Sequence, residues 1–541
     1  MKLNNAGLKD TAVWEKAGFL LPRFNREAMI RATEVSPRWV HFGAGNIFRI
    51  FPAALQQTLL EQGLEESGII VAEGYDGEII DRVFAPYDNL TVAVTLKADG
   101  AIEKRVIASI ARALRLDRAE DYRALGELFC KASLQMASFT ITEKGYAITG
   151  HDGGFLPDAA ADFTAGPDNS KSYLGKIASL CYARYRAGQF PLALVSMDNC
   201  SHNGEKLCLG LEPFARRWLE KGLVDKGFLD YIQNPAKVSF PWTVIDKITP
   251  RPGEGVRAML EEAGLEDTAE EVTAKNTYVA PFVNAEETQY LVIEDAFPAG
   301  RPALEKAGVL FTRRDRVNAV EQMKVCTCLN PLHTTLAVFG CLLGYTKISD
   351  EMGDPDLVKL IERIGYKEGL PVVTDPGILS PKDFIDQVLQ VRFPNPFMPD
   401  TPQRIASDTS QKIPIRFGET IKAYLTQGRA IHDLTGIPLT LAAWVRYLLG
   451  FDDEGRPFTV SPDPLYESLY RGLSKITLGQ QGPFHKELEP ILSNSAIFAV
   501  NLYKAVSPGG PSLGERVEVY FREMLAGPGA VRVTLKQHSG I

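Results

Sequence analysis

The chain of 541 residues exceeds one ordinary hydrophobic core, so its length predicts two domains. Hydrophobic residues make up 45% and charged residues 23%, a composition typical of a soluble globular protein. A formal net charge of −8, without any block of Lys and Arg, argues against a general nucleic-acid binder. The seven cysteines, an odd number, fit a reducing cytoplasm better than a disulfide framework.

The sequence gives no reason to expect a membrane protein or an exported one. No apolar run reaches the roughly 18–20 residues that span a bilayer. The first residues, MKLNNAGLKDTAVWEKAGF, lack the apolar core of a signal peptide. We therefore expect a cytoplasmic protein.

The first elements predict a βαβ unit. Residues 1–36 form a lead-in with a short helix, which ends at Ser36-Pro37. A short apolar strand over 38–42 leads into a glycine-containing turn. A helix from about 47 to 61 follows, and Pro52 is tolerable there if it lies in the first turn. A second strand over 68–73 completes the unit.

Further strands and then a series of helices follow. A strand pair is predicted at 90–96 and 104–108, and buried strands of the parallel-sheet kind at 137–142 and 192–196. Residues 150–170, rich in Gly, Asp, Ala and Pro, predict a surface excursion. From about residue 305 helical patterns dominate, at 315–346, 355–366, 382–392, 416–427, 435–451, 463–476, 485–505 and 512–526.

The turn after the first strand favours a dinucleotide site. Gly43 and Gly45 permit a tight turn and close approach of a pyrophosphate to the following helix N-terminus, although Phe48 replaces the usual third glycine. Glu73, at the end of the second strand, can accept both adenosine ribose hydroxyls and repels a 2′-phosphate, which favours NAD over NADP. Asp76 is the competing choice for that carboxylate. A glycine turn in some other α/β protein is the structural alternative.

The segment from Glu321 to His333 sets Lys324, Asn330 and His333 inside an apolar run. Burying an ammonium group is expensive unless its charge is paired or its proton is lost. Such a lysine beside neutral hydrogen-bonding side chains suits proton transfer. The alternative is a lysine that reaches solvent along its stem, a helix-capping asparagine and a histidine satisfied within the core.

Polar clusters follow other predicted strands. Asn199 lies in the segment Met197–Gly204, and its carboxamide could donate to a carbonyl oxygen. Thr140–Tyr146 and Phe240–Pro250 contain two more clusters. Asp-Asn and Asn-Gly pairs are common turn chemistry, so each pair alone is ambiguous. Strand carboxyl ends are nevertheless where open α/β sheets place ligands.

These segments together resemble the polyol-specific long-chain dehydrogenase/reductase family, which includes mannitol 2-dehydrogenase, fructuronate reductase and tagaturonate reductase. The matching motifs occur in family order from residue 41 to about 414. They are HFGAGNIFR (41–49), TITEKGY (140–146), SMDNCSHNG (196–204), FPWTVIDKITP (240–250), VIEDAFPAGRP (292–302), EQMKVCTCLNPLH (321–333) and RIASDTSQKIP (404–414).

The resemblance implies an α/β Rossmann-type N-terminal domain and a mostly α-helical C-terminal domain. We expect the lead-in at 1–36, the dinucleotide-binding domain at 37–308 and the substrate-binding and catalytic domain at 309–541, with the active site in the cleft between the two domains. The reaction expected is reversible, metal-independent hydride transfer between NAD(H) and a sugar carbon.

The resemblance also implies roles for individual residues. Lys324 corresponds to the general acid/base, Asn199 and Asn330 bind the reacting oxygen, His333 orients the substrate, and Glu321 assists proton exchange. Further candidates are Asn46, Ile47 and Asp198 for the cofactor, with Gly43, Gly45 and Glu73, and Arg404, Lys412 and Asp246 for the substrate.

The chain departs from the family pattern at three places. Six positions separate Lys324 from Asn330, where the family has five, so one residue is inserted. Because Asn330-Pro331 is a good pair for a helix start, a helix is expected to restart there. Lys247 replaces an Arg, and Tyr290-Leu291 replaces a Gln-Trp pair.

The expected substrate is an open-chain hexuronate, in the interconversion of D-fructuronate and D-mannonate. Mannitol 2-dehydrogenase and tagaturonate reductase activities remain alternatives, as does an inactive nucleotide-binding regulator. A zinc site formed by Cys326, Cys328 and His333 is disfavoured by the neighbouring Lys324. The expected partner is a small sugar acid or polyol, with no nucleic acid or membrane, and the chain is expected to be a monomer or a small homo-oligomer.

Overall fold

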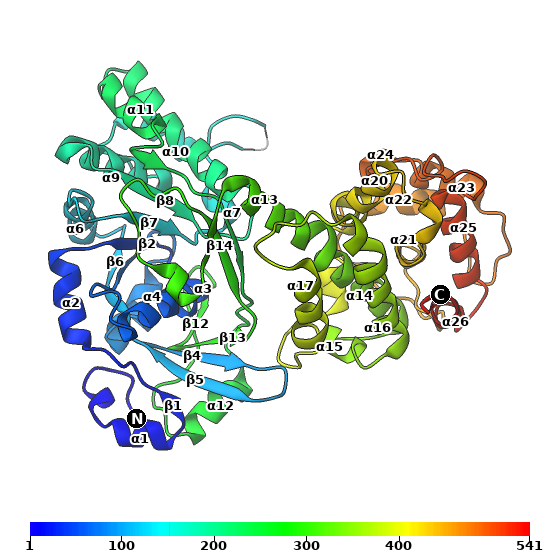
Figure 1. Ribbon diagram of the computed structural model, residues 1–541, viewed down its shortest axis with the longest axis horizontal. Helices are drawn as coiled ribbons and strands as arrows, with labels where there is room; N and C mark the ends of the chain where they lie inside the picture. Colours follow the sequence, from blue (N-terminus) through cyan, green and yellow to red (C-terminus); the bar gives the residue numbers. More distant parts are fainter. Residues whose placement is uncertain (151, 541) are drawn as a thin grey trace. The chain divides into compact units, whose positions relative to one another are not determined.

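The computed structural model describes residues 1–150 and 152–540. The chain forms two compact units. The N-terminal unit comprises residues 1–97 and 101–318, and the C-terminal unit comprises residues 98–100 and 319–541. The N-terminal unit contains the β-sheets and the C-terminal unit is built from helices (Figure 1).

A parallel six-stranded sheet is the framework of the N-terminal unit. Its strands are buried along most of their length, as expected for continuous apolar runs. The strand order is β6-β3-β2-β7-β8-β9, which is the 3-2-1-4-5-6 order of a doubly wound dinucleotide-binding sheet. The bounds are β2 Trp39–Phe42, β3 Ile69–Glu73, β6 Ile110–Arg115, β7 Met136–Phe139, β8 Leu192–Ser196 and β9 Val238–Ser239.

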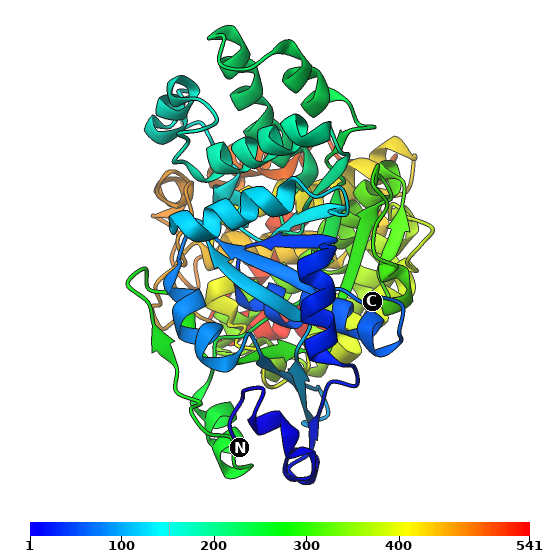
Figure 2. The same ribbon diagram turned by 90° about the vertical axis from the view of Figure 1, so that its left-hand side faces the viewer.

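Alternate residues of these strands enter separate hydrophobic cores on the two faces of the sheet. Val40 and Phe42 of β2 belong to one core, and Trp39 belongs to the other. This follows from the two-residue period of a strand. Figure 2 shows α2 and α6 lying in front of the sheet, and both helices contact its edge strand β6.

Three smaller sheets complete the strands of this unit. The predicted strand pair is confirmed as the antiparallel hairpin β4–β5. The lead-in is not separate from the fold, because β1 pairs with β5 and Trp14 is fully buried. The bounds are β1 Phe19–Leu20, β4 Thr91–Leu96, β5 Ile102–Ile107, β10 Thr243–Asp246, β11 Glu271–Val272, β12 Tyr278–Val279, β13 Phe282–Glu286, β14 Tyr290–Glu294 and β15 Leu310–Thr312.

The helices of the N-terminal unit correct two sequence predictions. The predicted helix at 47–61 is broken at Phe51, because Pro52 occupies the first turn of α4 and has no N–H to continue α3. The predicted excursion at 150–170 contains α8, which buries Phe163. The bounds are α1 Thr11–Lys16, α2 Arg26–Val35, α3 Asn46–Ile50, α4 Pro52–Glu61, α5 Glu78–Val83, α6 Ala119–Phe129, α7 Thr142–Gly145, α8 Pro157–Ala165, α9 Tyr173–Gly188, α10 Asn203–Glu220, α11 Lys226–Gln233 and α12 Glu254–Glu262. Helix α13, Arg314–Met323, passes from one unit to the other.

The described part of the C-terminal unit contains four π-helical turns among its α-helices, a form that is rare and frequent at functional sites. They are η4 Lys324–Cys328, η5 Arg363–Gly369, η7 Val388–Arg392 and η8 Pro414–Gly418. The α-helices are α14 Asn330–Leu343, α15 Ile348–Glu351, α16 Pro355–Glu362, α17 Pro381–Gln387, α18 Pro402–Ile405, α19 Thr409–Ile413, α20 Glu419–Thr426, α21 Gly436–Tyr447, α22 Tyr466–Leu473, α23 His485–Leu492, α24 Ser495–Phe498, α25 Leu513–Met524 and α26 Ala530–His538.

Two long helices predicted in this unit are interrupted. The predicted helix at 315–346 is divided by η4. The predicted helix at 485–505 is wrong, because Asn494 caps a new short helix through its side chain and the chain leaves the helical conformation after Phe498. Helix α26 was not anticipated from the sequence.

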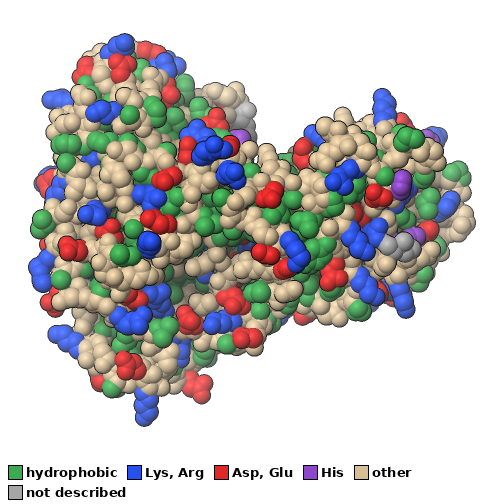
Figure 3. All heavy atoms as spheres, in the orientation of Figure 1, with side chains coloured by type: hydrophobic (Ala, Val, Ile, Leu, Met, Phe, Trp, Pro, Cys, Tyr) green, Lys and Arg blue, Asp and Glu red, His purple; other side chains and the backbone are tan. Residues whose placement is uncertain are grey.

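Taken together, α13, η4 and α14 span Arg314–Leu343, a stretch that is long and apolar enough to cross a membrane by length and composition alone. Within its most apolar window 78% is buried inside the structure, as in the core helix of a soluble protein. Elsewhere, acidic, basic and hydrophobic side chains are interspersed over the visible face of the N-terminal unit (Figure 3).

Candidate functional site

The turn after β2 contains two glycines, Gly43 and Gly45, and the structure explains each of them differently. Gly43 has a φ of 104°, and a Cβ at this position would lie 2.2 Å from the carbonyl oxygen of Thr140. Gly43 is therefore required by the close passage of the chain. A Cβ at Gly45 would have no other atom within 4 Å, so the backbone there faces open space. A diphosphate could approach the backbone at Gly45 without obstruction.

Glu73 fixes this turn to the end of the neighbouring strand. Its carboxylate accepts hydrogen bonds from the backbone N–H groups of Ala44 at 2.7 Å and Tyr75 at 2.7 Å, and from that of Asp76 at 3.0 Å. The competing carboxylate of Asp76 accepts from the hydroxyls of Thr273 and Thr277, both at 2.6 Å. The geometry therefore favours Glu73 as the carboxylate beside the glycine turn.

The residue in place of the third glycine packs against the sheet. Phe48 is fully buried and stacks on the ring of His41, with ring centroids 4.1 Å apart. His41 in turn contacts the hydroxyls of Ser138 and Thr140 on the neighbouring strand and its extension. The predicted cofactor-binding residues Asn46 and Ile47 form the start of this helix, α3.

Asp198 holds the loop that follows β7. Its carboxylate accepts from the N–H groups of Ile141 at 2.8 Å and Thr142 at 3.0 Å, and from the hydroxyl of Tyr146 at 2.5 Å. Burial raises the pKa of Asp198, and these hydrogen bonds partly offset that effect. The next residue, Asn199, is exposed.

The candidate residues of the N-terminal unit converge on one edge of the sheet. Strands β3, β2, β7 and β8 are neighbouring and parallel, so their carboxyl ends meet there. The hydrogen bonds from Ala44 to Glu73 and from Ile141 to Asp198 join these ends. This edge is where open α/β sheets bind ligands.

Asn203 was not singled out from the sequence, although it anchors the loop that carries Asn199. Its Nδ2 donates to the carbonyl oxygen of Asp198 at 3.0 Å and to the hydroxyl of Thr243 at 2.8 Å, and its Oδ1 accepts from the Thr243 N–H at 2.9 Å. The Asn-Gly pair in the sequence suggested only a turn. Thr243 begins β10, whose last residue is the buried Asp246, a predicted substrate-binding residue.

In the C-terminal unit, Lys324, Asn330 and His333 follow one another across a break in the helix. Lys324 begins η4 and its side chain is buried, at 5% exposure. Leu329 departs from helical geometry, with φ −130°, and α14 begins at Asn330 with Pro331 in its first turn. The predicted restart of the helix at Asn330 is confirmed. Glu321 lies half-buried in α13, three residues before Lys324.

The segment between Lys324 and Asn330 contains a π turn. A π turn contains more residues per turn than an α-helix, because its hydrogen bonds join residues five apart. The N–H of Leu329 donates to the carbonyl of Lys324 in this way, at 3.1 Å. A single wide turn of this kind can accommodate one residue more than an α-helical turn between Lys324 and Asn330.

His333 is surrounded by cations and one carboxylate. Its ring tilts against Phe393, and its Nε2 lies 3.5 Å from Asp400 Oδ2. Burial, followed by the charges of the surrounding cations, lowers the pKa of His333 to about 3. The imidazole is therefore neutral near pH 7. The cations are Arg416, Arg392, Arg404 and Lys412.

The four cations differ in what they contact. Arg404 forms an ion pair with Asp400. Lys412 donates to the carbonyl oxygens of Ile405 and Ser407. Arg416 donates to the Thr334 hydroxyl at 2.5 Å. Sequence reasoning found Arg404 and Lys412 but missed Asp400, Arg392 and Arg416.

The cysteines near Lys324 favour the protonated thiol. Burial raises the pKa of Cys326 and of Cys328 to about 12 each, whereas zinc binds the thiolate. Residues 1–150 and 152–540 contain no group of three or more His, Cys, Asp or Glu side chains placed to hold a metal ion. The donor set therefore gives no support to the zinc alternative.

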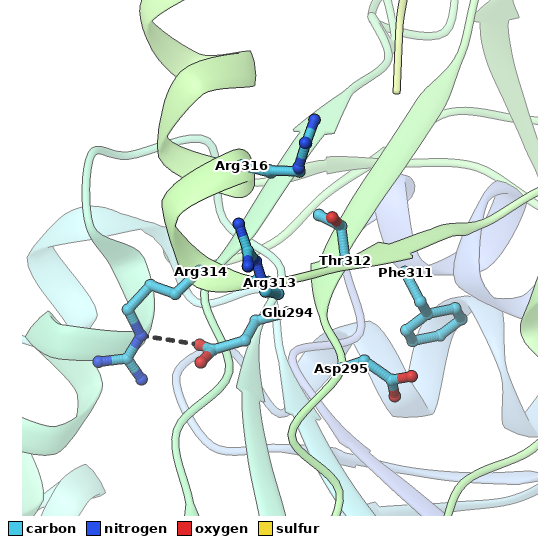
Figure 4. A pocket seen from close by; sticks show the side chains of 7 residues that line it. All are labelled: Glu294, Asp295, Phe311, Thr312, Arg313, Arg314 and Arg316. Carbon is cyan, nitrogen blue, oxygen red and sulfur yellow. Dashed lines mark hydrogen bonds and ion pairs between the residues drawn. The ribbon is translucent and has the colours of Figure 1, made fainter. Parts of the chain in front are cut away.

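A cavity of about 550 Å³ lies in the N-terminal unit. Figure 4 shows its lining, in which Arg314 reaches Glu294 at 2.9 Å. The lining residues come from the ends of β14 and β15 and the start of α13, and none of them was among the predicted site residues.

Two family models cover most of the chain. The model described as the mannitol dehydrogenase Rossmann domain matches residues 37–306. The model described as the mannitol dehydrogenase C-terminal domain matches residues 316–505.

Curated and solved proteins give a consistent picture. A D-mannonate oxidoreductase of Thermotoga maritima is 51% identical over 544 residues, which cover 100% of this chain and 99% of that protein. The crystal structure of a substrate-free D-sorbitol dehydrogenase matches with a TM-score of 0.78 and 25% identity, and the match covers 95% of this chain and 97% of that one. The Pseudomonas fluorescens mannitol 2-dehydrogenase in complex with NAD and D-mannitol gives a TM-score of 0.68 and 27% identity over 99% of both chains.

Proposed function

Because the chain belongs to the mannitol dehydrogenase family, we propose that it is an NAD-dependent D-mannonate oxidoreductase, which interconverts D-mannonate and D-fructuronate. The observation that carries this proposal is the 51% identity with a D-mannonate oxidoreductase over essentially the whole length of both proteins. The cations around His333 support an anionic sugar acid as substrate.

The N-terminal unit is proposed to bind the dinucleotide. Residues 37–308 form this functional domain, and residues 309–541 form the substrate-binding and catalytic domain. Gly43, Gly45, Asn46 and Ile47 hold the pyrophosphate, and Glu73 holds the adenosine ribose. Asp198 contributes by fixing the loop after β7. A bound nicotinamide supplies or accepts the hydride.

Lys324 is the proposed general acid and base. During reduction, hydride adds to the carbonyl carbon, negative charge grows on the oxygen, and the Lys324 ammonium donates the proton that completes the alcohol. During oxidation the neutral amine takes that proton back. Asn199 and Asn330 stabilise the charge on the oxygen through preorganised hydrogen bonds.

Other residues position the substrate and renew the proton. His333, neutral near pH 7, can hydrogen-bond a sugar hydroxyl without adding charge. Glu321 assists proton exchange between Lys324 and solvent. Arg404, Lys412 and Asp246 hold the part of the sugar chain away from the reacting carbon. No residue in this scheme requires a metal ion.

The proposal extends to the setting of the enzyme. All seven cysteines are free, which supports a reducing compartment such as the cytoplasm. The functional form is proposed to be a monomer or a small homo-oligomer, without nucleic-acid or membrane partners.

The direct test follows NADH oxidation with D-fructuronate, D-tagaturonate, D-fructose and fructose 6-phosphate as separate substrates. The proposal predicts turnover with D-fructuronate that exceeds turnover with the others. Preference for D-tagaturonate or D-fructose would move the enzyme to tagaturonate reductase or mannitol 2-dehydrogenase activity. NADH binding without turnover of any substrate would indicate an inactive nucleotide-binding regulator.

A further inference from the structure

Arg416 is a partly buried cation of the C-terminal unit whose charge is not opposed by a nearby carboxylate. It is half-buried and lies in the π turn η8, four residues after Lys412. Its Nη1 donates to the Thr334 hydroxyl at 2.5 Å. Among the described residues, no carboxylate lies within 4.0 Å of its guanidinium. Burial lowers the pKa of Arg416 to about 10, and no nearby carboxylate opposes that effect.

The neighbouring cations are compensated in other ways. Arg404 forms an ion pair with Asp400, the carboxylate that also lies 3.5 Å from His333. Lys412 donates to two backbone carbonyl oxygens, and Asp408 and Asp463 partly offset the repulsion that it receives from Arg416 and Arg404. The charge of Arg416 therefore remains available to an anion.

Arg416 lies next to the residues that the mechanism uses. Its partner Thr334 directly follows His333 on α14, and the π turns η8 and η4 are in contact. Lys324 begins η4, so the same pair of π turns carries the proton donor and this guanidinium. A half-buried guanidinium without a carboxylate is costly unless a ligand supplies the negative charge.

We propose that Arg416 binds the carboxylate of the sugar acid and is the residue that selects a hexuronate over a neutral ketose. This inference rests on the proposed function and names the group that recognises its substrate. The carboxylate of D-fructuronate lies at the end of the chain away from the reacting carbonyl. A planar guanidinium can bind it through two parallel hydrogen bonds, whereas a hydroxymethyl group offers neither the charge nor that geometry.

The test compares Arg416→Met and Arg416→Lys with the wild-type enzyme on D-fructuronate and D-fructose. Hydrogen bonds to charged groups contribute enough that Arg416→Met should raise the KM for D-fructuronate about 10- to 100-fold. The KM for NADH and the rate with D-fructose should stay within about twofold, because neither ligand uses the carboxylate-binding group. Arg416→Lys keeps the charge but not the fork, and should lose less.

Two matched variants separate this role from general effects. Arg429→Met removes an exposed arginine of the same unit and should leave all parameters unchanged. Arg404→Met should affect D-fructuronate and D-fructose alike. If Arg404→Met lost activity with D-fructuronate only, and Arg416→Met kept that activity, Arg404 would be the residue that binds the carboxylate. The inference would then be wrong.

The remaining outcomes also decide the question. Equal losses on both ketoses in Arg416→Met and Arg416→Lys would assign Arg416 a structural role only. If Arg416→Met fails to fold, Arg416→Lys still tests selectivity, and unchanged kinetics in that variant would contradict the fork geometry. If the wild-type enzyme turned over fructose 6-phosphate faster than D-fructuronate, and both Arg416 variants lost that activity, the group that Arg416 binds would be a phosphate and not a carboxylate. Absence of wild-type turnover with any sugar acid would instead refute the proposed function itself.

Discussion

Lys324 is the residue through which the proposed proton transfer passes. It is buried at the start of a π turn, and Asn330 and His333 follow on the next helix. Replacing it with Met gives an unbranched side chain of similar length without the amino group that donates and accepts the proton. Because general acid–base catalysis contributes about 100- to 10,000-fold, Lys324→Met should lower kcat by that factor.

The control for this prediction is cofactor binding. Quenching of protein fluorescence by NADH should be unchanged in Lys324→Met, since the lysine is not among the proposed cofactor-binding residues. Retention of more than about a tenth of the wild-type kcat would remove Lys324 from the role of acid and base.

Glu351 is a buried carboxyl group that the mechanism does not use. It is fully buried, and neither of its oxygens has a hydrogen-bond partner among the described residues. Burial, with the charges of Asp354 and Asp350, raises the pKa of Glu351 to about 10. Between the ordinary pKa of a glutamate and this value, the folded protein binds one more proton than the unfolded chain. Stability therefore falls as the pH rises through this window.

Glu351→Gln removes this titration while it keeps the shape of the side chain. At pH 8 the variant should be more stable than the wild type by roughly 1–3 kcal/mol, and near pH 4 the two should differ little. Urea denaturation at both pH values measures the difference. An identical dependence on pH in the two proteins would show that Glu351 is not protonated in the folded state.

At the residue scale, the sequence predicted which residues belong to the candidate site better than it predicted what those residues contact. Gly43, Gly45 and Glu73 are placed together as predicted, because a βαβ unit fixes where a strand end and a glycine turn meet. Asp198 could be found by pattern, but its use as the anchor for Ile141 and Thr142 depends on a strand brought alongside by folding. No sequence pattern marks Asp400 or Arg416 as site residues. Folding places both of them near His333.

At the scale of elements, we propose that the π turn η4 accommodates the additional residue that the sequence comparison predicts between Lys324 and Asn330. In an α-helix each residue turns the chain by about 100°, so an insertion without a π turn would rotate Asn330 away from Lys324. Deletion of Val325 should convert the turn to α-helix and keep the relative orientation. We expect kcat/KM to stay within about tenfold of the wild type, whereas insertion of an Ala after Val325 should abolish activity.

The two variants serve as controls for each other, because both alter the same turn by one residue. Thermal unfolding establishes that each is folded. Loss of activity in the folded deletion variant, with activity kept in the insertion variant, would show that η4 does not absorb the additional residue.

The elements themselves were predicted where local pattern decides them. Buried apolar runs gave β2, β3, β7 and β8, and helical periodicity gave most of the C-terminal unit. The breaks were missed where single residues override the pattern, as Pro52 does between α3 and α4 and Asn494 does before α24. A π turn has no recognisable sequence pattern, so η5, η7 and η8 could not be predicted.

At the scale of the whole molecule, a chain of net charge −8 gathers Arg392, Arg404, Lys412 and Arg416 around one histidine. Surface charges of both signs are interspersed on the visible face of the N-terminal unit (Figure 3). Such a concentration of positive charge in a negatively charged protein favours a small anion over a neutral sugar.

Specificity for a hexuronate is tested by the ratio of kcat/KM for D-mannonate to that for D-mannitol, with NAD as the acceptor. The two sugars carry the same hydroxyl groups along their chains and differ at the end that bears the carboxylate. We expect a ratio of about 100 or more, since a desolvated guanidinium–carboxylate pair contributes up to about 3 kcal/mol. A ratio near one, or below it, would contradict a hexuronate oxidoreductase and identify a polyol dehydrogenase instead.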